Sequence, residues 1–345
     1  MRRTAALIVG GGPAGAAAAI TLARAGADHL LVERTRETGD ALCGGFLSWR
    51  SLETLGALGI DAEQLGQPIT RTRLFAGSHV AEAPLPRHAR AVSRHRLDSL
   101  LLAAAARAGA RIERGVHIRR LDDVSAATVL LATGKHDLRG LPRPVEDDPT
   151  LGLRVRLAAS PVLTRAVGDA VELHLFDRGY AGVARQEDGS ANVCLAVRRS
   201  RLHEAGSPIA LLESLATGPL GERLAALDST TPVDAVANVP YGWRCREGTP
   251  CLYRLGDQAG VIPSLAGEGM GIALASGVSA AQALLNGTAA SAWQRTFARR
   301  ISRPIARADR IRAAMERPRL ALPLVAVARL APALVAWAAT ATRIP

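Results

Sequence analysis

A glycine-rich turn near the start of the chain constrains the fold more than any other feature. The run TAALIVG (4–10) is a compact apolar strand pattern that ends where the glycines begin. AAAAITLARAG (16–26) then has the composition of a helix that closes at Gly26, and HLLVER (29–34) is a second short strand ending in Glu33. These segments predict a complete β-turn-α-β unit.

The glycines of this turn have the spacing of a dinucleotide-binding site. Gly10, Gly12 and Gly15 fit G-x-G-x-x-G, in which the first permits a tight turn, the second admits a pyrophosphate and the third lets helix and strand pack closely. The helix that opens at Pro13 and Ala14 would point its free N–H groups at the phosphates. Glu33, followed by Arg34, stands where a carboxylate would bind ribose hydroxyls.

An export signal is the competing interpretation of the same residues. Arg2, Arg3 and the alanines 16–19 imitate its basic and small-residue regions, but the glycines and Pro13 interrupt its apolar core. The four cysteines form no CxxC pair, and no histidine cluster has zinc spacing, so neither a disulfide framework nor a metal site is expected. We therefore expect a cytoplasmic protein with reduced thiols.

The charge of the chain is strongly positive, at +12. All but one of its 43 basic residues are arginine, because Lys135 is the only lysine. Aromatic residues make up only 3% and the arginines are spread along the chain, which argues against stacking on nucleic-acid bases. A basic face that meets anionic lipid or an acidic carrier protein stays open.

A second motif far along the chain indicates which dinucleotide is bound. Residues 252–277 read LYRLGDQAGVIPSLAGEGMGIALASG and resemble the second flavin motif of the para-hydroxybenzoate hydroxylase superfamily. The resemblance implies FAD as cofactor, with Asp257, after Gly256, hydrogen-bonded to the ribityl chain. It also implies that the start of the following helix faces the flavin pyrimidine. The loop and helix start that would form the wall beside the ring comprise Pro263, Gly267, Glu268, Gly269 and Met270.

Two weaker motifs agree with this resemblance. RHRLD (94–98) looks like the superfamily's R-x-x-L-[DE] segment, which assigns Arg94 to the FAD phosphates or ribityl chain; a solvated arginine at a helix start is the alternative. ATVLLATG (127–134) is a β-branched strand ending in Ala132, Thr133 and Gly134, similar to the family strand that passes the adenosine.

The segment ALCGGFLSWRSLETLGALGI (41–60) points to the chemistry. Ser48 can cap a helix with leucines at helical spacing. Before it, Cys43, Gly44 and Gly45 resemble the C-G-G/E-G-x-S segment of geranylgeranyl reductases, which implies a position beside the flavin. There the Cys43 thiol would act as a catalytic proton donor or tune the flavin; a small buried residue is the alternative.

The resemblance covers most of the chain and implies a fold of class α/β (α+β). We expect a discontinuous Rossmann-like FAD-binding domain (1–67, 93–150 and 247–290), an interleaved substrate domain (68–92 and 151–246) and a C-terminal helical segment (291–345). The substrate domain should be an antiparallel sheet over the flavin. In NVPYGWRCR (238–246), Tyr241 and Trp243 are candidate pocket aromatics and Arg244 a candidate anion anchor, with ordinary packing as the alternative for each.

The implied function is that of an FAD-dependent oxidoreductase acting on a lipophilic substrate, isoprenoid or polyketide-like, by hydride transfer between flavin N5 and a C=C bond. An aromatic hydroxylase using NAD(P)H, and a flavin electron relay without an organic product, are the alternatives. Halogenation is excluded because two features of flavin halogenases are missing. Lys135, the only lysine, stands in the wrong context to be their catalytic lysine, and the W-x-W-x-I-P segment is absent from the sequence. No second Rossmann unit is present, so NAD(P)H would bind transiently, or a redox partner protein would serve.

The last 28 residues, PRLALPLVAVARLAPALVAWAATATRIP, are strongly apolar. Pro323, Arg329 and Pro332 interrupt them, whereas a spanning helix needs about 20 uninterrupted apolar residues. We expect a helix pair that covers the substrate cavity. A peripheral membrane contact that admits lipophilic substrate is the second interpretation.

Overall fold

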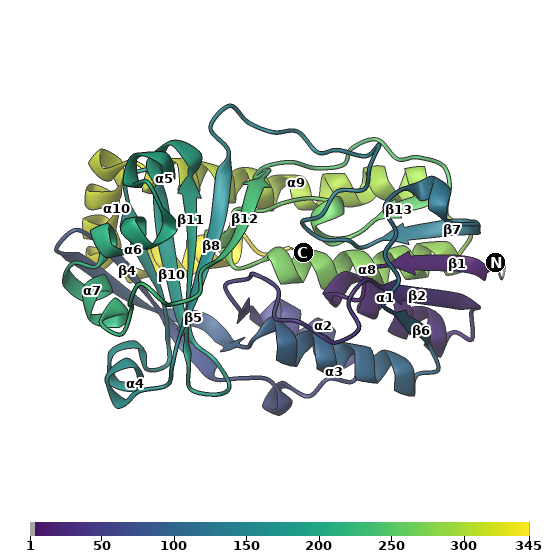
Figure 1. The fold of residues 1–345 in the computed structure, drawn as a ribbon, viewed down its shortest axis with the longest axis horizontal. Coiled ribbons are helices and arrows are strands. Elements are labelled where there is room, and N and C mark those ends of the chain that lie inside the picture. The colour runs from purple at the N-terminus through teal and green to yellow at the C-terminus, as the bar shows by residue number, and fades with distance from the viewer. Residues whose placement is uncertain (1–3, 345) are drawn as a thin grey trace.

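A computed structural model describes residues 4–344, so Arg2 and Arg3 lie outside the described residues. The N-terminal segments form the expected β-turn-α-β unit as part of a parallel sheet, sheet A (Figure 1). Across the sheet its strands are β13 (Leu252–Arg254), β7 (Ala126–Leu131), β1 (Thr4–Val9), β2 (His29–Glu33) and β6 (Arg111–Arg114). Because all five strands are parallel, their carboxyl ends meet at one edge.

Small residues bring two helices of the FAD-binding motifs into close contact. α1 (Pro13–Arg24) packs against α8 (Gly269–Leu285) on one side and α3 (Arg94–Arg107) on the other. At Gly277 of α8, a Cβ would lie only 2.2 Å from the backbone oxygen of Ala14. The alanines of α1 and Gly277 therefore allow the helices to approach so closely that both N-termini reach the same edge of sheet A.

A second, eight-stranded sheet, sheet B, lies beside this unit (Figure 1). Its strand order is β12 (Asp234–Val239), β8 (Thr150–Leu157), β11 (Ala191–Arg198), β10 (Gly179–Arg185), β9 (Ala170–Phe176), β4 (Pro68–Ala76), β5 (His79–Ala91) and β3 (Phe46–Leu47). The expectation of an antiparallel sheet holds for all pairs but one. β4 runs parallel to β9, since the β4–β5 hairpin joins the later strands from a different part of the chain.

One face of sheet B is covered by short helices that the sequence pattern did not predict. Their apolar side chains, such as Leu211 and Leu220, pack against Val183 and Val193 of the sheet. These helices are α4 (Pro161–Val167), α5 (Arg199–Ala205), α6 (Pro208–Leu215) and α7 (Gly218–Leu224). Their shortness explains the omission, because seven or eight residues give little helical periodicity.

The predicted helix after Ser48 is present, and short 3-10 segments complete the connections. α2 (Trp49–Ala57) starts at Ser48, whose hydroxyl accepts a hydrogen bond from the backbone N–H of Ser51. The 3-10 segments are η1 (Ala62–Gln64), η2 (Leu121–Asp123), η3 (Gly256–Gln258) and η4 (Ser264–Ala266). The fold class is confirmed: a Rossmann-like sheet, an interleaved mixed sheet and C-terminal helices. On this strand order we propose the domain limits given above.

Three helices end the chain: α9 (Ala290–Met315), α10 (Pro318–Leu330) and α11 (Pro332–Ala341). α10 and α11 pack against β5, and α10 also against β4. Among residues 4–344 no single helix is long and apolar enough to cross a membrane, while α10 and α11 pass that test only as a pair bent by 110°. Pro332 separates the two helices, as its position in the sequence predicts.

Candidate functional site

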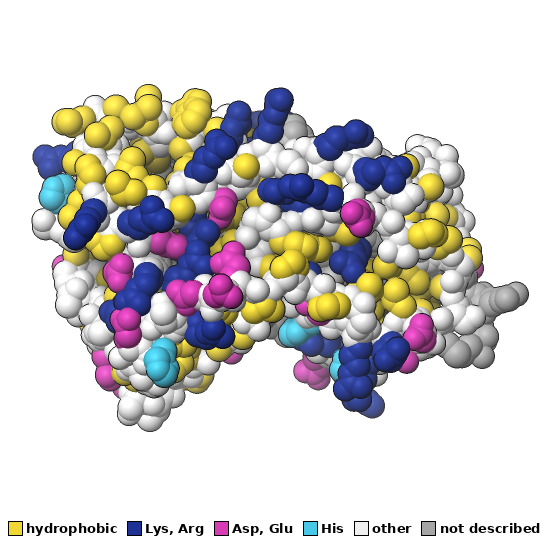
Figure 2. All heavy atoms as spheres, turned by 90° about the horizontal axis from the view of Figure 1, so that it is seen from above, with side chains coloured by type: hydrophobic (Ala, Val, Ile, Leu, Met, Phe, Trp, Pro, Cys, Tyr) yellow, Lys and Arg dark blue, Asp and Glu magenta, His cyan; other side chains and the backbone are white. Residues whose placement is uncertain are grey.

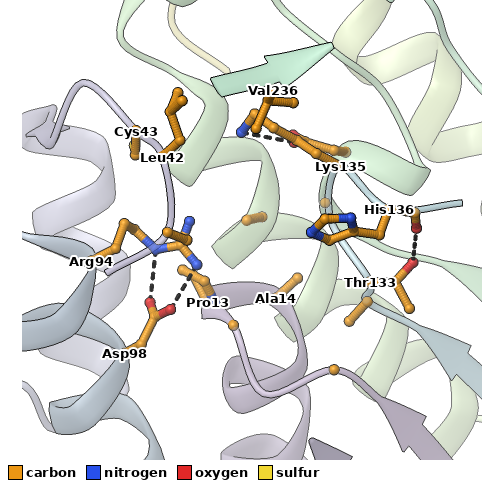
Figure 3. Close-up of a pocket in the computed structure, with 18 of the residues that line it drawn as sticks. Pro13, Ala14, Leu42, Cys43, Arg94, Asp98, Thr133, Lys135, His136 and Val236 are labelled. Atoms are coloured by element: carbon orange, nitrogen blue, oxygen red, sulfur yellow. Dashed lines mark hydrogen bonds and ion pairs between the residues drawn. The ribbon is translucent and has the colours of Figure 1, made fainter. Parts of the chain in front are cut away.

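A cavity of about 950 Å³ lies between the carboxyl edge of sheet A and sheet B. The turns after β1, β7 and β13 form one wall, and β8, β11 and β12 contribute Gly152, Cys194 and Val236 to another. In Figure 3, Pro13 and Ala14 at the start of α1 lie below this space, with Arg94 and Cys43 on one side and Lys135 and His136 on the other. The cavity thus collects residues from both sheets.

The turn before α1 is built for close backbone approach. Gly10 has a φ of +110°, and a Cβ there would lie 2.4 Å from the backbone oxygen of Ala132. Gly15 does not line the cavity; a Cβ on it would lie 1.9 Å from the oxygen of Gly10, which is the helix–strand contact expected of the third glycine. Gly12 precedes Pro13 without a side-chain cap, so the first N–H groups of α1 are free to bind an anion.

Glu33 lies at the end of β2 and holds the glycine turn in place. Its Oε2 accepts a hydrogen bond from the backbone N–H of Gly11 at 2.7 Å, and its Oε1 accepts two from Thr35. Burial opposes ionisation of Glu33, but these hydrogen bonds together keep its pKa below the usual value. The ionised carboxylate lines the cavity beside Arg34, at the end distant from sheet B.

Arg94 places a buried cation next to the glycine turn. Its guanidinium forms two hydrogen bonds to the Asp98 carboxylate one helical turn later, at 2.9 and 2.7 Å. Burial lowers the pKa of Arg94 and the Asp98 charge raises it; the net effect is a rise, so Arg94 stays charged. Its Nη2 lies 3.2 Å from where a Cβ on Gly12 would stand, so the cation faces the N-terminus of α1.

The N-terminus of α8 also opens into the cavity, at Gly269 and Met270. Gly267, with a φ of +64°, lines the cavity, but Pro263 and Glu268 do not. The expectation that Pro263 and Glu268 form part of the wall is therefore revised. The Glu268 carboxylate is fully buried on the other side of the loop, where it accepts hydrogen bonds from Ser48 and Arg343.

Asp257 follows Gly256 after the end of β13 and lies beside Lys135, and both residues line the cavity. The Lys135 ammonium lies 3.4 Å from the Asp257 carboxylate, which raises the pKa of Lys135. The backbone N–H of Gly256 donates to the hydroxyl of Ser276 on α8 at 2.8 Å. The Gly-Asp turn is thus tied to the helix whose N-terminus opens beside it.

The segment after β7 lines the cavity with Ala132, Thr133 and Gly134. His136 follows them, and its Nε2 accepts a hydrogen bond from Arg34 at 2.9 Å. Burial, together with the Arg34 charge, lowers the pKa of His136, which favours the neutral imidazole. This contact joins the ends of β2 and β7 at the rim of the cavity.

The Cys43–Gly44–Gly45 loop lines the cavity from the side of sheet B. The backbone oxygen of Cys43 accepts a hydrogen bond from Asn192 of β11 at 2.9 Å. Gly45 has a φ of +73°, and a Cβ there would meet the oxygen of Val92 at 2.8 Å. The loop is thereby fixed against both β11 and the end of β5, with the Cys43 side chain at the cavity.

A second thiol faces the same cavity. Cys194 lies on β11 two residues after Asn192, and burial raises its pKa to about 12, so it stays protonated at neutral pH. Sequence reasoning missed Cys194, Lys135 and His136 as cavity residues. A signal existed for the latter two, because they directly follow a parallel strand whose end forms this edge.

The three candidate substrate residues separate in the structure. Tyr241 lines the cavity and donates a hydrogen bond to Ser264 at 2.7 Å. Trp243 and Arg244 do not line it: Trp243 packs under the Arg143 guanidinium, and Arg244 lies in a bridge to Gly260. The expectation that these two face a substrate is revised.

The two ends of the cavity differ in character. Free N–H groups of two helices and the cations Arg94 and Lys135 surround one region, which fits an anionic dinucleotide. Under sheet B the walls are mostly apolar, with Leu42, Leu195, Val236 and Val239. In the described part of the chain no three His, Cys, Asp or Glu side chains come together as a metal site requires.

Comparison with known proteins agrees with this geometry. Residues 3–139 match the FAD-binding domain family. The chain is 30% identical to digeranylgeranylglycerophospholipid reductase 1 of Methanopyrus kandleri, an alignment covering 79% of this chain and 77% of that protein. It is 27% identical to the menaquinone reductase of Mycolicibacterium smegmatis, with coverages of 92% and 86%.

Solved structures share the fold at lower sequence identity. PqsL of Pseudomonas aeruginosa, described as a probable FAD-dependent monooxygenase, superposes with a TM-score of 0.74. The match covers 92% of this chain and 98% of PqsL at 17% identity. This likeness concerns the fold alone.

Proposed function

The chain belongs to the geranylgeranyl reductase family of FAD-dependent oxidoreductases, and from this premise we propose that it transfers hydride to or from a C=C bond of a lipophilic substrate. The observation that carries the proposal is the two-ended cavity. Its polar end suits FAD, and its apolar end under sheet B suits an isoprenoid or polyketide-like chain. The names of the two relatives, which refer to a geranylgeranyl lipid and a menaquinone, support the same substrate class.

The polar end supplies groups for each part of the cofactor. We assign the pyrophosphate to the N-terminus of α1 and the Arg94 guanidinium, which lie side by side. Glu33 would accept hydrogen bonds from the ribose, beside Ala132–Gly134 and Arg34. Asp257 would accept hydrogen bonds from the ribityl hydroxyls in addition to its ion pair with Lys135. The N-terminus of α8 would face the flavin pyrimidine.

FAD, when bound, supplies the hydride chemistry, and NAD(P)H or a redox partner protein would supply its electrons. Reduction of a double bond also needs one proton at the second carbon. The Cys43 thiol is the candidate donor, because its loop lines the cavity where both sheets meet. The Asn192 hydrogen bond fixes that loop, and Tyr241 with Ser264 closes the neighbouring wall.

Two other functions predict different products. A hydroxylase would require oxygen and NAD(P)H and would add one oxygen atom to the substrate. An electron relay would oxidise and reduce its flavin with quinone but would change no other organic molecule.

An anaerobic turnover separates the three. The purified holoprotein would be reduced with dithionite, mixed with a geranylgeranyl lipid, and the lipid analysed by mass spectrometry. We expect the lipid to gain pairs of hydrogen atoms without oxygen. Addition of an oxygen atom only in air would establish the hydroxylase, and an unchanged lipid across isoprenoid, polyketide and aromatic substrates would favour the relay.

A further inference from the structure

The two last helices expose an apolar surface that the site does not use. No residue of α10 or α11 lines the cavity, contrary to the expectation that this pair covers it. Ala321, Val325 and Ala328 of α10 are buried against Leu74 and other side chains of sheet B. Val335 of α11 packs against the same cluster, but seven large apolar side chains of the two helices are exposed. We call them the apolar ridge: Leu320, Leu322, Leu324, Val327, Leu330, Leu334 and Trp337.

The exposure of the ridge is large for apolar residues. Leu330 is 85% exposed, Trp337 64% and Leu334 50%. Figure 2 shows hydrophobic side chains gathered at the end of the molecule where Figure 1 places α10. Contiguous apolar surface of this kind marks an interaction site on a folded protein. The polar residues that face outward between these apolar ones include Arg319 and Arg329.

The charges around the ridge indicate that its partner is anionic. Between Ala290 and Ile344 the sequence has eleven arginines but only two acidic residues, Asp309 and Glu316, and no acid follows Glu316. Arg312, which is buried, is paired with both acids. The rest of this segment is therefore strongly cationic, and an acidic protein surface or an anionic lipid surface would complement it.

Four of the exposed cations of α9 form a row at one-turn spacing. Arg295, Arg299, Arg303 and Arg307 are four residues apart and, within residues 4–344, form no ion pair. Arg307 donates a hydrogen bond to the backbone oxygen of Ala341 at 3.1 Å, so the row reaches the end of α11. Figure 2 shows Lys and Arg side chains in a row beside the hydrophobic cluster.

We propose that the apolar ridge and the α9 arginine row together dock the protein on an anionic lipid bilayer. The ridge enters the acyl boundary, Trp337 lies at the headgroup level, and the arginines bind lipid phosphates. A bilayer suits both features at once, because its acyl boundary takes the apolar side chains while its phosphates neutralise a row of arginines beside them. This docking concerns binding alone and stands apart from the reaction proposed above.

Vesicle flotation of the FAD-loaded full chain tests the proposal. We expect binding to phosphatidylcholine vesicles that contain phosphatidylglycerol, weak binding to phosphatidylcholine alone, and a decline with added salt. Leu330→Ser/Trp337→Ser should lower the partition coefficient roughly tenfold or more, whereas Val145→Ser/Val162→Ser, which are exposed apolar residues outside the ridge, should not change it. Arg303→Glu should lower it about fivefold or more, and the exposed Arg107→Glu on α3 should have a smaller effect.

Trp337 offers a second measurement that does not depend on the ridge variants folding. Its fluorescence should be quenched by brominated lipid, and Trp337→Phe should remove the quenching while vesicle binding persists. Absence of wild-type binding to anionic vesicles would overturn the proposal. So would equal losses in the ridge and control variants, or a wild-type dimer in sedimentation that the ridge variant converts to monomer.

Discussion

The Arg343 guanidinium donates a hydrogen bond to the fully buried Glu268 carboxylate at 2.7 Å. This pair joins the last described residues of the chain to the loop that leads into α8. The guanidinium also lies over the Trp49 ring, 5.0 Å from its centroid. The C-terminal helices and one wall of the cavity are therefore mechanically connected.

Arg343→Met should lower the free energy of unfolding by about 3–5 kcal/mol, because it leaves Glu268 buried without a cation. Urea denaturation measures this. Arg329→Met, an exposed control in α10, should change the value by less than about 0.5 kcal/mol. Glu268→Gln/Arg343→Met should recover part of the loss, and equal losses in both single arginine variants would refute the connection.

Two helical glycines give a matched test of the turn. Gly15→Ala would place a Cβ 1.9 Å from the backbone oxygen of Gly10, and should lower the unfolding free energy by about 1–3 kcal/mol or more. Gly56→Ala in α2 meets open space and should raise it by up to about 1 kcal/mol. Thermal denaturation compares them; a neutral Gly15→Ala would contradict the close packing of α1 on β1.

Much of the candidate cofactor site could be predicted from local sequence. The turn at Gly10–Gly15 and the Gly256–Asp257 turn are specified by glycines whose backbone conformation other residues rarely adopt. The fold brings these two turns together because parallel strands end at one edge of sheet A. The family resemblance then indicated that the cofactor is FAD.

The remainder depends on contacts between distant segments, which a single sequence does not encode locally. Cys194 joins Cys43 at the cavity only because β11 lies beside the CGG loop. The parallel pairing of β4 with β9 likewise depends on a strand about 100 residues away. The Glu268 carboxylate points away from the cavity because it is paired with Arg343, which is 75 residues further along the chain.

Glu172 in sheet B gives a pH-dependent prediction. It is fully buried and bonded to Arg223, Arg73 and His174. Burial alone would raise the pKa of Glu172, but His174 and Arg223 lower it from 4.5 to about 2. Its contribution to stability is therefore present above pH 4.5 and is lost as the pH falls through about 2.

Glu172→Gln should accordingly reduce the unfolding free energy at pH 7 by roughly 3 kcal/mol and flatten its acid dependence between these two pKa values. Urea denaturation across this pH range is the measurement. The exposed Glu213→Gln on α6 should retain the wild-type profile. An unchanged acid profile in Glu172→Gln would show that Glu172 is not ionised in the folded protein.

The proton-donor role of Cys43 predicts a selective loss of turnover. Cys43→Ala should lower the rate of product formation by about 10²–10⁴-fold while FAD remains bound, because Asn192 still holds the backbone oxygen of residue 43 and only the weak Gly45 N–H contact to the sulfur is lost. Mass spectrometry of the lipid product and the flavin spectrum report the two effects separately. The exposed Cys251→Ser is the control; unchanged turnover in Cys43→Ala would assign the thiol a packing role.

The central claim is that two turns almost 250 residues apart bind one FAD molecule, and titration of FAD into the flavin-free protein tests it most directly. Flavin fluorescence should show one FAD bound per chain. Glu33→Arg at one end and Asp257→Ala at the other should each weaken binding roughly tenfold or more, while the exposed Glu37→Arg should not. A wild-type protein that takes up no FAD in excess, or two site variants that bind it as wild type does, would contradict the claim.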